Sequence, residues 1–341
     1  MPAAKSLNLA LQGGGSHGAF TWGVIDRLLE DGRVELDGIC GTSAGAINAV
    51  VYAHGMMRGG RDGAREALER FWRRISEAGA LYSPVRASPF EGLAGAELVQ
   101  QLSYSAFETV TRVLSPYQFN PFNFNPLREV LAQTVDFDAV RACDCAKLFL
   151  CATNVRTGKP RIFQNREVTA DAVLASSCLP FLFQAVEIEG EAYWDGGYIG
   201  NPPIYPLIYD TATRDVLIVH VNPLVRTELP RRADEIMNRI NEISFNSSLV
   251  REMRAIAFVQ KLIADGWLKE QHSAKLKMLL MHAIRTDEAL CEFGVQTKLR
   301  ADWDFLARLR DLGREHAARW LDANYDAIGV HQTVDLRAEY L

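Results

Sequence analysis

A serine with a glycine two positions away on each side is the first candidate for chemistry in this sequence. The pattern is Gly41-Thr42-Ser43-Ala44-Gly45, between a short apolar run, Gly38–Cys40, and a segment of small residues, Ala44–Tyr52, that is compatible with a helix. A serine at a sharp strand-to-helix turn is typical of acyl-transfer nucleophiles, because the flanking glycines leave room for the turn and for substrate. The amino terminus of the helix would favour negative charge nearby. Ser43 is therefore a candidate nucleophile.

A second glycine-rich stretch, Gly13-Gly14-Gly15-Ser16-His17-Gly18, follows an apolar run and precedes a segment with helical spacing, Ala19–Leu29. Its spacing also fits the Gly-x-Gly-x-x-Gly motif of dinucleotide-binding proteins, which requires an acidic residue at the end of the second strand. Here Glu35 and Asp37 come before the end of that strand and Ser43 follows it, so a nucleotide site is disfavoured. The alternative is that free N–H groups of the loop stabilise an oxyanion close to Ser43.

A serine hydroxyl needs a neighbouring base, and histidine backed by a carboxylate is the usual one. The histidines that follow Ser43, in the order typical of α/β-hydrolases, are His220, His272, His282, His316 and His331. His220 lies inside a predicted strand, and His282 and His316 lie in segments with helical spacing, so none is predicted in a loop at a strand end. A histidine-dependent serine esterase that uses His220 remains an alternative.

Asp195-Gly196-Gly197 offers a different base, because it follows a predicted hairpin at the end of a strand. A carboxylate followed by two glycines can approach a serine without crowding from neighbouring side chains. An ordinary aspartate, with a pKa of about 3.9, is a weak base, so it would have to act together with groups that stabilise the oxyanion. Asp-Gly-Gly is also a common tight turn, and the motif alone favours the turn.

The composition indicates a globular protein without a strongly charged partner. Of the 341 residues, 48% are hydrophobic and 23% are charged, and the formal net charge is −5. This charge, with no block of basic residues, argues against nucleic acid and against a polybasic membrane site. No apolar run is long enough to span a bilayer, and we expect no metal and no cofactor. We therefore expect a cytoplasmic protein, and nothing in the sequence indicates a homo-oligomer.

The cysteines are scattered, and they are Cys40, Cys143, Cys145, Cys151, Cys178 and Cys291. Several lie in apolar runs with the character of strands, which favours buried free thiols over disulfides. Cys143-x-Cys145 lacks the spacing of a metal-binding motif and has no matching pair elsewhere.

Strand-like and helical segments alternate through the first part of the chain, which predicts an α/β fold with right-handed crossovers. Further buried strands are expected at Lys147–Asn154 and Val216–Val221, and a helical pattern continues from Arg232 onward. The region from about 79 to 126 differs, because its residues 115–126 are uncharged and rich in aromatic residues, proline and asparagine. Such a stretch suits either a lid at the mouth of an apolar pocket or a loop packed on the core.

Taken in order, Gly-Gly-Gly-x-x-Gly-Ala-Phe, Gly-Thr-Ser-Ala-Gly and Asp-Gly-Gly resemble the patatin-like phospholipase family. The segment Ala175–Ile204, around Asp195, also looks like that family, and the resemblance covers roughly residues 7–222. It implies a three-layer α/β/α fold, and we expect a mostly parallel central sheet. We expect a catalytic domain over residues 1–225 and a helical C-terminal region over residues 226–341, packed on the same domain.

The resemblance further implies a serine lipid acyl hydrolase that cleaves carboxylic esters through a Ser43–Asp195 dyad without histidine. The oxyanion loop would be Gly13, Gly14 and Gly15, and the supporting residues would be His17, Gly18, Gly41, Gly45, Gly196 and Gly197. The substrate would be a lipid or another ester. Membrane contact would be peripheral and transient, through an apolar mouth such as Phe119–Phe124. A catalytically silent lipid-binding scaffold is the second alternative.

One position departs from the family pattern. The residue after Ser16 is often Arg or Lys in the family and is His17 here, so a permanent positive charge near the oxyanion is lost. We expect this change to affect rate and pH dependence rather than the type of reaction. The stretch after about Val225 matches no motif.

Overall fold

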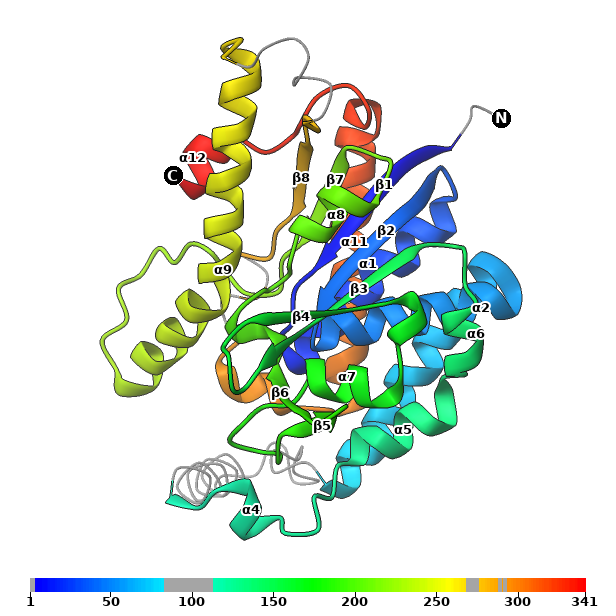
Figure 1. Cartoon of the computed structure of the whole chain (residues 1–341), viewed down its shortest axis with the longest axis vertical. Helices are drawn as coiled ribbons and strands as arrows, with labels where there is room; N and C mark the ends of the chain where they lie inside the picture. The colour runs from blue at the N-terminus through cyan, green and yellow to red at the C-terminus, as the bar shows by residue number, and fades with distance from the viewer. Residues whose placement is uncertain (1–3, 83–112, 268–275, 288–289, 291–292) are drawn as a thin grey trace.

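The computed structural model describes residues 4–82, 113–267, 276–287, 290 and 293–341. The strands of its sheet are β1 (Lys5–Leu11), β2 (Val34–Thr42), β3 (Lys147–Asn154), β4 (Pro160–Gln164), β5 (Val186–Ile188), β6 (Glu191–Asp195), β7 (Asp215–Val219) and β8 (Leu280–Ile284). They follow the order β5-β6-β3-β2-β1-β7-β8, with β4 also pairing with β3 (Figure 1). Strands β3, β2, β1, β7 and β8 pair in parallel, whereas β4, β5 and β6 pair antiparallel.

The described helices cover both faces of this sheet. They are α1 (Gly18–Asp31), α2 (Ala44–Tyr82), α4 (Pro116–Phe119), α5 (Pro126–Thr134), α6 (Phe137–Arg141), α7 (Ala170–Ser176), α8 (Tyr205–Asp210), α9 (Ala233–Ala264), α11 (Trp303–Asn324) and α12 (Leu336–Tyr340). Short 3₁₀ helices are η1 (Gly15–His17), η2 (Asn165–Glu167), η3 (Gly196–Tyr198), η4 (Val295–Leu299) and η5 (Tyr325–Ala327). The arrangement confirms the expected three-layer α/β/α fold with a mostly parallel sheet.

The alternation of side chains along β1 divides the core into two parts. Leu7, Leu9 and Leu11 belong to the larger core, with residues of α1, α2 and α11. Ala10 faces the other way, into a smaller core with residues of α8, α9 and α12. Successive side chains of a strand point to opposite faces, so a central parallel strand is apolar on both sides. This explains the nearly continuous apolar run from which the strand was predicted.

Helix α2 consists of two helical segments that meet at a kink. Gly59 and Gly60 depart from helical geometry, and Gly60 has a φ of +62°, so the helix kinks there. The second segment buries Ala64, Leu68 and Phe71. Only one of its faces is solvated.

The C-terminal region contributes to the sheet as well as to the helices. Residues 280–284 were predicted to be helical and instead form β8, which pairs in parallel with β7. That prediction was wrong because a short apolar run next to helical segments has no periodicity that separates strand from helix. Helix α11 packs closely on α1: a Cβ on Gly23 would lie 1.9 Å from the Arg310 carbonyl oxygen. The division at residue 225 remains a prediction.

Two further expectations meet the structure only in part. Cys143 and Cys145 form a disulfide, which corrects the expectation of free thiols at these positions. Free thiols, all buried, are present at Cys40, Cys151 and Cys178. Of the candidate lid region, residues 83–112 lie outside the described part of the chain, and the rest includes α4. No described helix is both long enough and apolar enough to cross a membrane.

Candidate active site

Ser43 lies at the turn between β2 and α2, directly after the strand and directly before the helix. Its backbone φ is +53°, a left-handed conformation that is uncommon for a residue with a Cβ and is typical of functional sites. Its N–H donates to Ser176 Oγ at 3.0 Å, and its carbonyl accepts from the Ile47 N–H at 3.0 Å. The side chain is half-buried and lines a cavity. The turn thus presents the hydroxyl to the cavity at the amino terminus of a helix.

Glycines around this turn allow neighbouring segments of the chain to approach it closely. A Cβ on Gly45 would lie 2.3 Å from the Leu11 carbonyl oxygen, and one on Gly41 would lie 2.6 Å from the Gly45 carbonyl carbon. A Cβ on Gly18 would lie 2.5 Å from Ala44 Cβ. These distances are shorter than any real contact, so the first strand, the turn and α1 meet only because these positions carry no side chain.

The Asp195 backbone is fixed where β6 ends. Its N–H donates to the Cys178 carbonyl at 2.8 Å, and its carbonyl accepts from Thr153 Oγ1 at 2.8 Å. Gly196 follows against β3, where a Cβ would lie 2.2 Å from the Cys151 carbonyl oxygen. The side chain therefore leaves the strand end in one direction.

The Asp195 carboxylate is buried, with a relative exposure of 1%. Oδ1 accepts from the Gly197 N–H at 2.7 Å, whereas Oδ2 has no hydrogen bond of normal length from any described residue. Burial raises the pKa of Asp195 to about 6, and the Gly197 N–H, the Ser43 hydroxyl and the Lys298 ammonium limit the rise. Hydrogen bonds of a reacting pair are often long in the empty state. The arrangement makes Asp195 a stronger base than an ordinary aspartate, beside Ser43.

The glycine loop lies against the same turn. A Cβ on Gly13 would lie 2.9 Å from Ser43 Cβ. The Gly13 N–H donates to Asn201 Oδ1 at 2.6 Å, so it is not available to an oxyanion. The N–H groups of Gly14 and Gly15 have no acceptor among the described residues. The predicted set of donors is therefore reduced to Gly14 and Gly15.

Gly15 is the position in the loop that requires glycine most strongly. Its φ is +58°, and a Cβ there would lie 2.3 Å from the Lys298 carbonyl oxygen. A side chain would strain the backbone and displace η4, which packs on the loop.

His17 is buried behind the loop and is not a cation. Its Nε2 forms a hydrogen bond with Thr297 Oγ1 at 2.7 Å, and its ring packs near Phe293 and Phe305. Burial and the nearby Lys298 lower the pKa of His17 to about 3. The imidazole therefore stays neutral at pH 7.

Three of the alternative histidine bases, which are His220, His282 and His316, contact groups other than Ser43. His220 Nε2 pairs with the Tyr340 hydroxyl at 3.0 Å, and burial lowers the pKa of His220 to about 3. His282 pairs with Asp215, at 3.1 Å, on β8 and β7. His316 packs against the ring of Phe20. No histidine of the described residues forms a hydrogen bond with Ser43, and His272 lies outside them.

Lys298, on η4, brings a positive charge to the site from far along the chain. Its Nζ donates to Asn222 Oδ1 at 2.8 Å and to Asn241 Oδ1 at 2.9 Å. Burial lowers the pKa of Lys298 to about 8, although Glu242 and Asp195 oppose this decrease. The amine remains mostly charged at pH 7.

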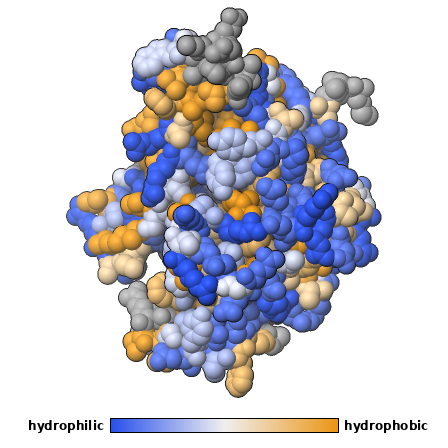
Figure 2. Space-filling model, viewed as in Figure 1, coloured by the Kyte–Doolittle hydropathy of each residue, from blue (hydrophilic) through white to orange (hydrophobic). Residues whose placement is uncertain are grey.

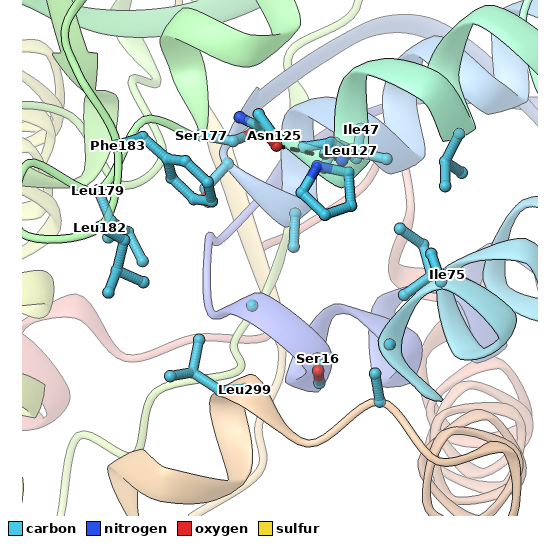
Figure 3. Close-up of a pocket in the computed structure, with 18 of the residues that line it drawn as sticks. Ser16, Ile47, Ile75, Asn125, Leu127, Ser177, Leu179, Leu182, Phe183 and Leu299 are labelled. Atoms are coloured by element: carbon cyan, nitrogen blue, oxygen red, sulfur yellow. Dashed lines mark hydrogen bonds between the residues drawn. The ribbon is translucent and has the colours of Figure 1, made fainter. Parts of the chain in front are cut away.

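A mostly apolar cavity of about 540 Å³ opens onto Ser43 (Figure 3). Leu179, Leu182 and Phe183 project into it from one side and Ile75 from the opposite side, while Ser16 and Leu299 lie along its floor. Residues 119–120 and 124–127 also line it. An apolar volume beside a serine suits a hydrocarbon chain with its polar end at the hydroxyl.

The structure brings Ser43, Asp195 and the glycine loop together, as the motifs predicted. Sequence reasoning missed Ser176, Asn201, Asn222 and Lys298. Asn201 had a signal, because it follows Asp-Gly-Gly closely. Ser176 also had one, because it lies in the segment Ala175–Ile204 that resembles the family, whereas Asn222 and Lys298 lie outside any motif and reach the site through the fold. No group of three or more His, Cys, Asp or Glu side chains among the described residues is arranged to hold a metal ion.

Comparisons with known proteins place the chain in a family. A family model described as patatin-like phospholipase matches residues 9–208, more than half of the chain. A search of curated proteins found no match.

Two solved structures are similar at low identity. The crystal structure of VipD from Legionella pneumophila is 15% identical, with a TM-score of 0.41, and the match covers 94% of this chain and 67% of that one. The complex of full-length SpcU with full-length ExoU, from the type III secretion system of Pseudomonas aeruginosa, is 16% identical, with a TM-score of 0.31. That match covers 93% of this chain and 53%, about half, of the other. On the strength of the family match, the chain belongs to the patatin-like phospholipase family, a family of lipid acyl hydrolases.

Proposed function

We propose that this chain hydrolyses carboxylic esters of lipids, with Ser43 as the nucleophile and Asp195 as the base. The observation that carries the proposal is the buried Asp195 carboxylate, which has an unpaired oxygen and lies beside the strained Ser43 turn. A buried polar atom without a partner costs stability, and such costs are typical of functional sites.

In the first step, Ser43 Oγ attacks the ester carbonyl carbon, and its proton passes to Asp195 Oδ2. The carbonyl oxygen becomes an oxyanion that accepts from the Gly14 and Gly15 N–H groups. When the tetrahedral adduct collapses, the ester C–O bond breaks, and the proton on Asp195 passes to the departing alkoxide. The products of this step are the alcohol and an acyl ester of Ser43.

In the second step, water attacks the acyl ester while Asp195 accepts one of its protons. Collapse of this adduct returns the proton to Ser43 Oγ and releases the fatty acid. Asp195 must be ionised at the start of both steps. Since its pKa is raised to about 6, activity should fall as the pH drops through about 6.

The cavity favours a substrate whose medium or long acyl chain binds in it. Its lining is mostly apolar, and burial of each methylene contributes about 0.8 kcal/mol. We propose no preference for a head group, because the described lining offers few polar contacts. The proposal covers phospholipids, other lipids and polyesters as substrates.

Exposed aromatic side chains near the cavity support transient contact with a lipid surface. Phe122 is 94% exposed, and Tyr117 and Phe181 are more than half exposed. Figure 2 shows apolar side chains at the lower edge of the molecule, over α4. Aromatic side chains at such a position can enter the headgroup region of a membrane.

The test is hydrolysis of a chromogenic medium-chain ester by the wild type and by Ser43→Ala, Asp195→Asn and His220→Ala. We expect the first two variants to lose at least about 10³-fold in kcat, the range for removal of a nucleophile or base. His220→Ala should keep its kcat if it folds. Circular dichroism and thermal melting provide the folding control.

Two results would overturn the proposal. Activity that survives in Asp195→Asn but not in His220→Ala would move the base to His220. A wild type that is silent on all esters, and is not labelled by an organophosphonate, would favour the lipid-binding scaffold.

A further inference from the structure

A lysine from outside the family match brings a positive charge next to the glycine loop. We propose that Lys298 is a positioning residue of this hydrolase: its ammonium group orients the Gly14 N–H through Asn222 and supplies the positive charge that His17 does not carry. This inference rests on the proposed function. Lys298 lies on η4, beyond residues 9–208 that match the family.

The Lys298 ammonium, together with Gln12 Oε1 and the Gly13 carbonyl, fixes which way the Asn222 amide faces. An ammonium group only donates hydrogen bonds, so Asn222 must present Oδ1 to it, at 2.8 Å. The amide nitrogen then points the other way, where it donates to the Gly13 carbonyl at 2.8 Å. Asn222 is fully buried, so its amide has no solvent to turn toward.

The Gly13 carbonyl in turn determines the direction of the next N–H. In a trans peptide, the C=O of one residue and the N–H of the following residue lie in one plane and point in opposite directions. The bond from Asn222 to the Gly13 carbonyl therefore directs the Gly14 N–H away from Asn222. On the other side, Asn201 holds the Gly13 N–H at 2.6 Å. Both peptide planes of Gly13 are fixed, one of them through Lys298.

Contacts of η4 hold Lys298 against the loop. Its carbonyl oxygen occupies the space where a Cβ of Gly15 would lie, and the neighbouring Thr297 pairs with His17. Figure 3 shows η4 directly beside the glycine loop, with Leu299 and Ser16 on the same side of the cavity. Lys298 is therefore packed against the loop that carries the proposed oxyanion donors.

The charge of Lys298 is not neutralised by a direct ion pair among the described residues. Its ammonium donates hydrogen bonds to the neutral amides of Asn222 and Asn241. Glu242, the acid on α9 whose charge acts on Lys298, is already paired with Arg226 and with Arg239, the latter at 3.1 Å. The other titratable groups that face Lys298 are Asp195 and the neutral His17. The field of the ammonium thus acts on the reacting carboxylate and on a developing oxyanion.

The experiment compares pH profiles of kcat and kcat/KM on a soluble chromogenic ester for the wild type, Lys298→Met and Lys298→Arg. The wild type should lose activity below about pH 6, as Asp195 is protonated, and above about pH 8, as Lys298 loses its proton. Lys298→Met should lower kcat about 10- to 100-fold, with KM changed less, because an oxyanion donor is worth about 10²-fold or more. Its acidic limb should move to higher pH, because Asp195 loses a neighbouring positive charge.

Lys298→Arg separates charge from structure. A guanidinium stays protonated throughout this pH range, so this variant should recover part of kcat and lose the alkaline limb. Lys277→Met is the matched control, because Lys277 also has a partly buried amine, which donates to main-chain carbonyls of Leu207, Thr211 and Thr213. It should change stability without changing either limb.

Asn241→Ala provides a second test that does not remove the lysine. Loss of an acceptor for the charged form should lower the pKa of Lys298 further, so the alkaline limb should move below pH 8. If Lys298→Met fails to fold, the alkaline limb of Asn241→Ala tests the role of Lys298 instead. The inference is overturned if Lys298→Met keeps the wild-type kcat and acidic limb, or if Asn241→Ala leaves the alkaline limb in place. If the wild type itself hydrolyses no ester, that result contradicts the proposed function rather than the role of Lys298.

Discussion

Two buried aspartates lie on opposite sides of the three central strands of the sheet, and their surroundings differ. Asp195 ends β6 beside the Ser43 turn, whereas Asp215 begins β7, and both are almost fully buried. Asp215 Oδ1 accepts from the Gly329 N–H at 2.7 Å and pairs with His282 Nε2 at 3.1 Å. Asp195 has one such partner, Gly197, and an unpaired Oδ2.

The difference separates a structural carboxylate from a reactive one. Burial alone does not mark a functional site, because both groups are buried to the same extent. An unsatisfied oxygen next to a strained serine does mark a functional site. Such an arrangement costs stability and persists only where the surrounding structure maintains it. Asp215 should therefore contribute to stability, and Asp195 should reduce it.

After removal of Ser43 or Asp195 themselves, the largest loss of kcat is expected where the proposed oxyanion donors are disturbed. Gly15→Ala should lower kcat about 10²- to 10³-fold, the range for loss of an oxyanion donor, because a Cβ there collides with the Lys298 carbonyl. The comparison is with Thr333→Val, which removes a partner of His282 in the other cluster. Thr333→Val should leave kcat unchanged. Equal losses of kcat in both variants would erase the distinction between the clusters.

Asp215→Ala should destabilise the fold without slowing the reaction. It leaves the Gly329 N–H and the His282 ring without their buried acceptor, which costs about 2–3 kcal/mol in the free energy of unfolding. Urea unfolding measures this loss, and ester hydrolysis at low denaturant measures kcat. A loss of kcat with unchanged stability would make Asp215 a functional residue instead.

Asp195→Asn should increase the free energy of unfolding, which is the opposite of the effect expected for Asp215→Ala. The folded pKa of Asp195, about 6, is higher than its ordinary value of 3.8, so the folded state binds the proton more tightly than the unfolded state. The resulting cost to stability is absent below about pH 4 and is complete above about pH 6. At pH 8 the variant should be more stable than the wild type by about 1–3 kcal/mol. Near pH 4 the gain should disappear, and a gain that is the same at both pH values would contradict this origin.

The smallest effect concerns the surface around the active cluster. Phe122 is almost fully exposed, so Phe122→Asp should leave hydrolysis of a soluble ester unchanged. On phospholipid vesicles the rate should fall by about tenfold or less, because partial entry of one aromatic side chain into the headgroup region gains less than full burial, which contributes about 1.5–3 kcal/mol. Tyr209→Asp, at an exposed position on α8, is the control. Equal vesicle rates for Phe122→Asp and the wild type would remove the proposed membrane contact.

The sequence predicted the parts of the molecule that depend on local rules. Gly-x-Ser-x-Gly, the triple glycine and Asp-Gly-Gly each need glycine for a turn or a close approach, so they are visible as motifs. The buried strand β1 and the helix α11, which begins after the Asp302 cap, also follow local patterns. These signals were sufficient for the fold class, and they named Ser43, Asp195 and the glycine loop, whose catalytic roles remain predictions.

The sequence could not predict what depends on distant contacts. Lys298 is one lysine among many charged residues, and only the packing of η4 on the loop brings it to Asn222. The loss of Gly13 as a donor depends on Asn201, which reaches it from 188 positions along the chain. Strand β8 was missed because only its pairing with β7 distinguishes it from a buried helical segment.

The most direct test of the Ser43–Asp195 account is the pH dependence of covalent labelling of Ser43 by an organophosphonate, followed by mass spectrometry. The account predicts that the wild type is labelled at Ser43, with a rate that rises through about pH 6 as Asp195 loses its proton. Asp195→Asn should be labelled slowly at every pH. Fast labelling of Asp195→Asn, or a wild-type rate that does not change between pH 5 and pH 7, would contradict the account.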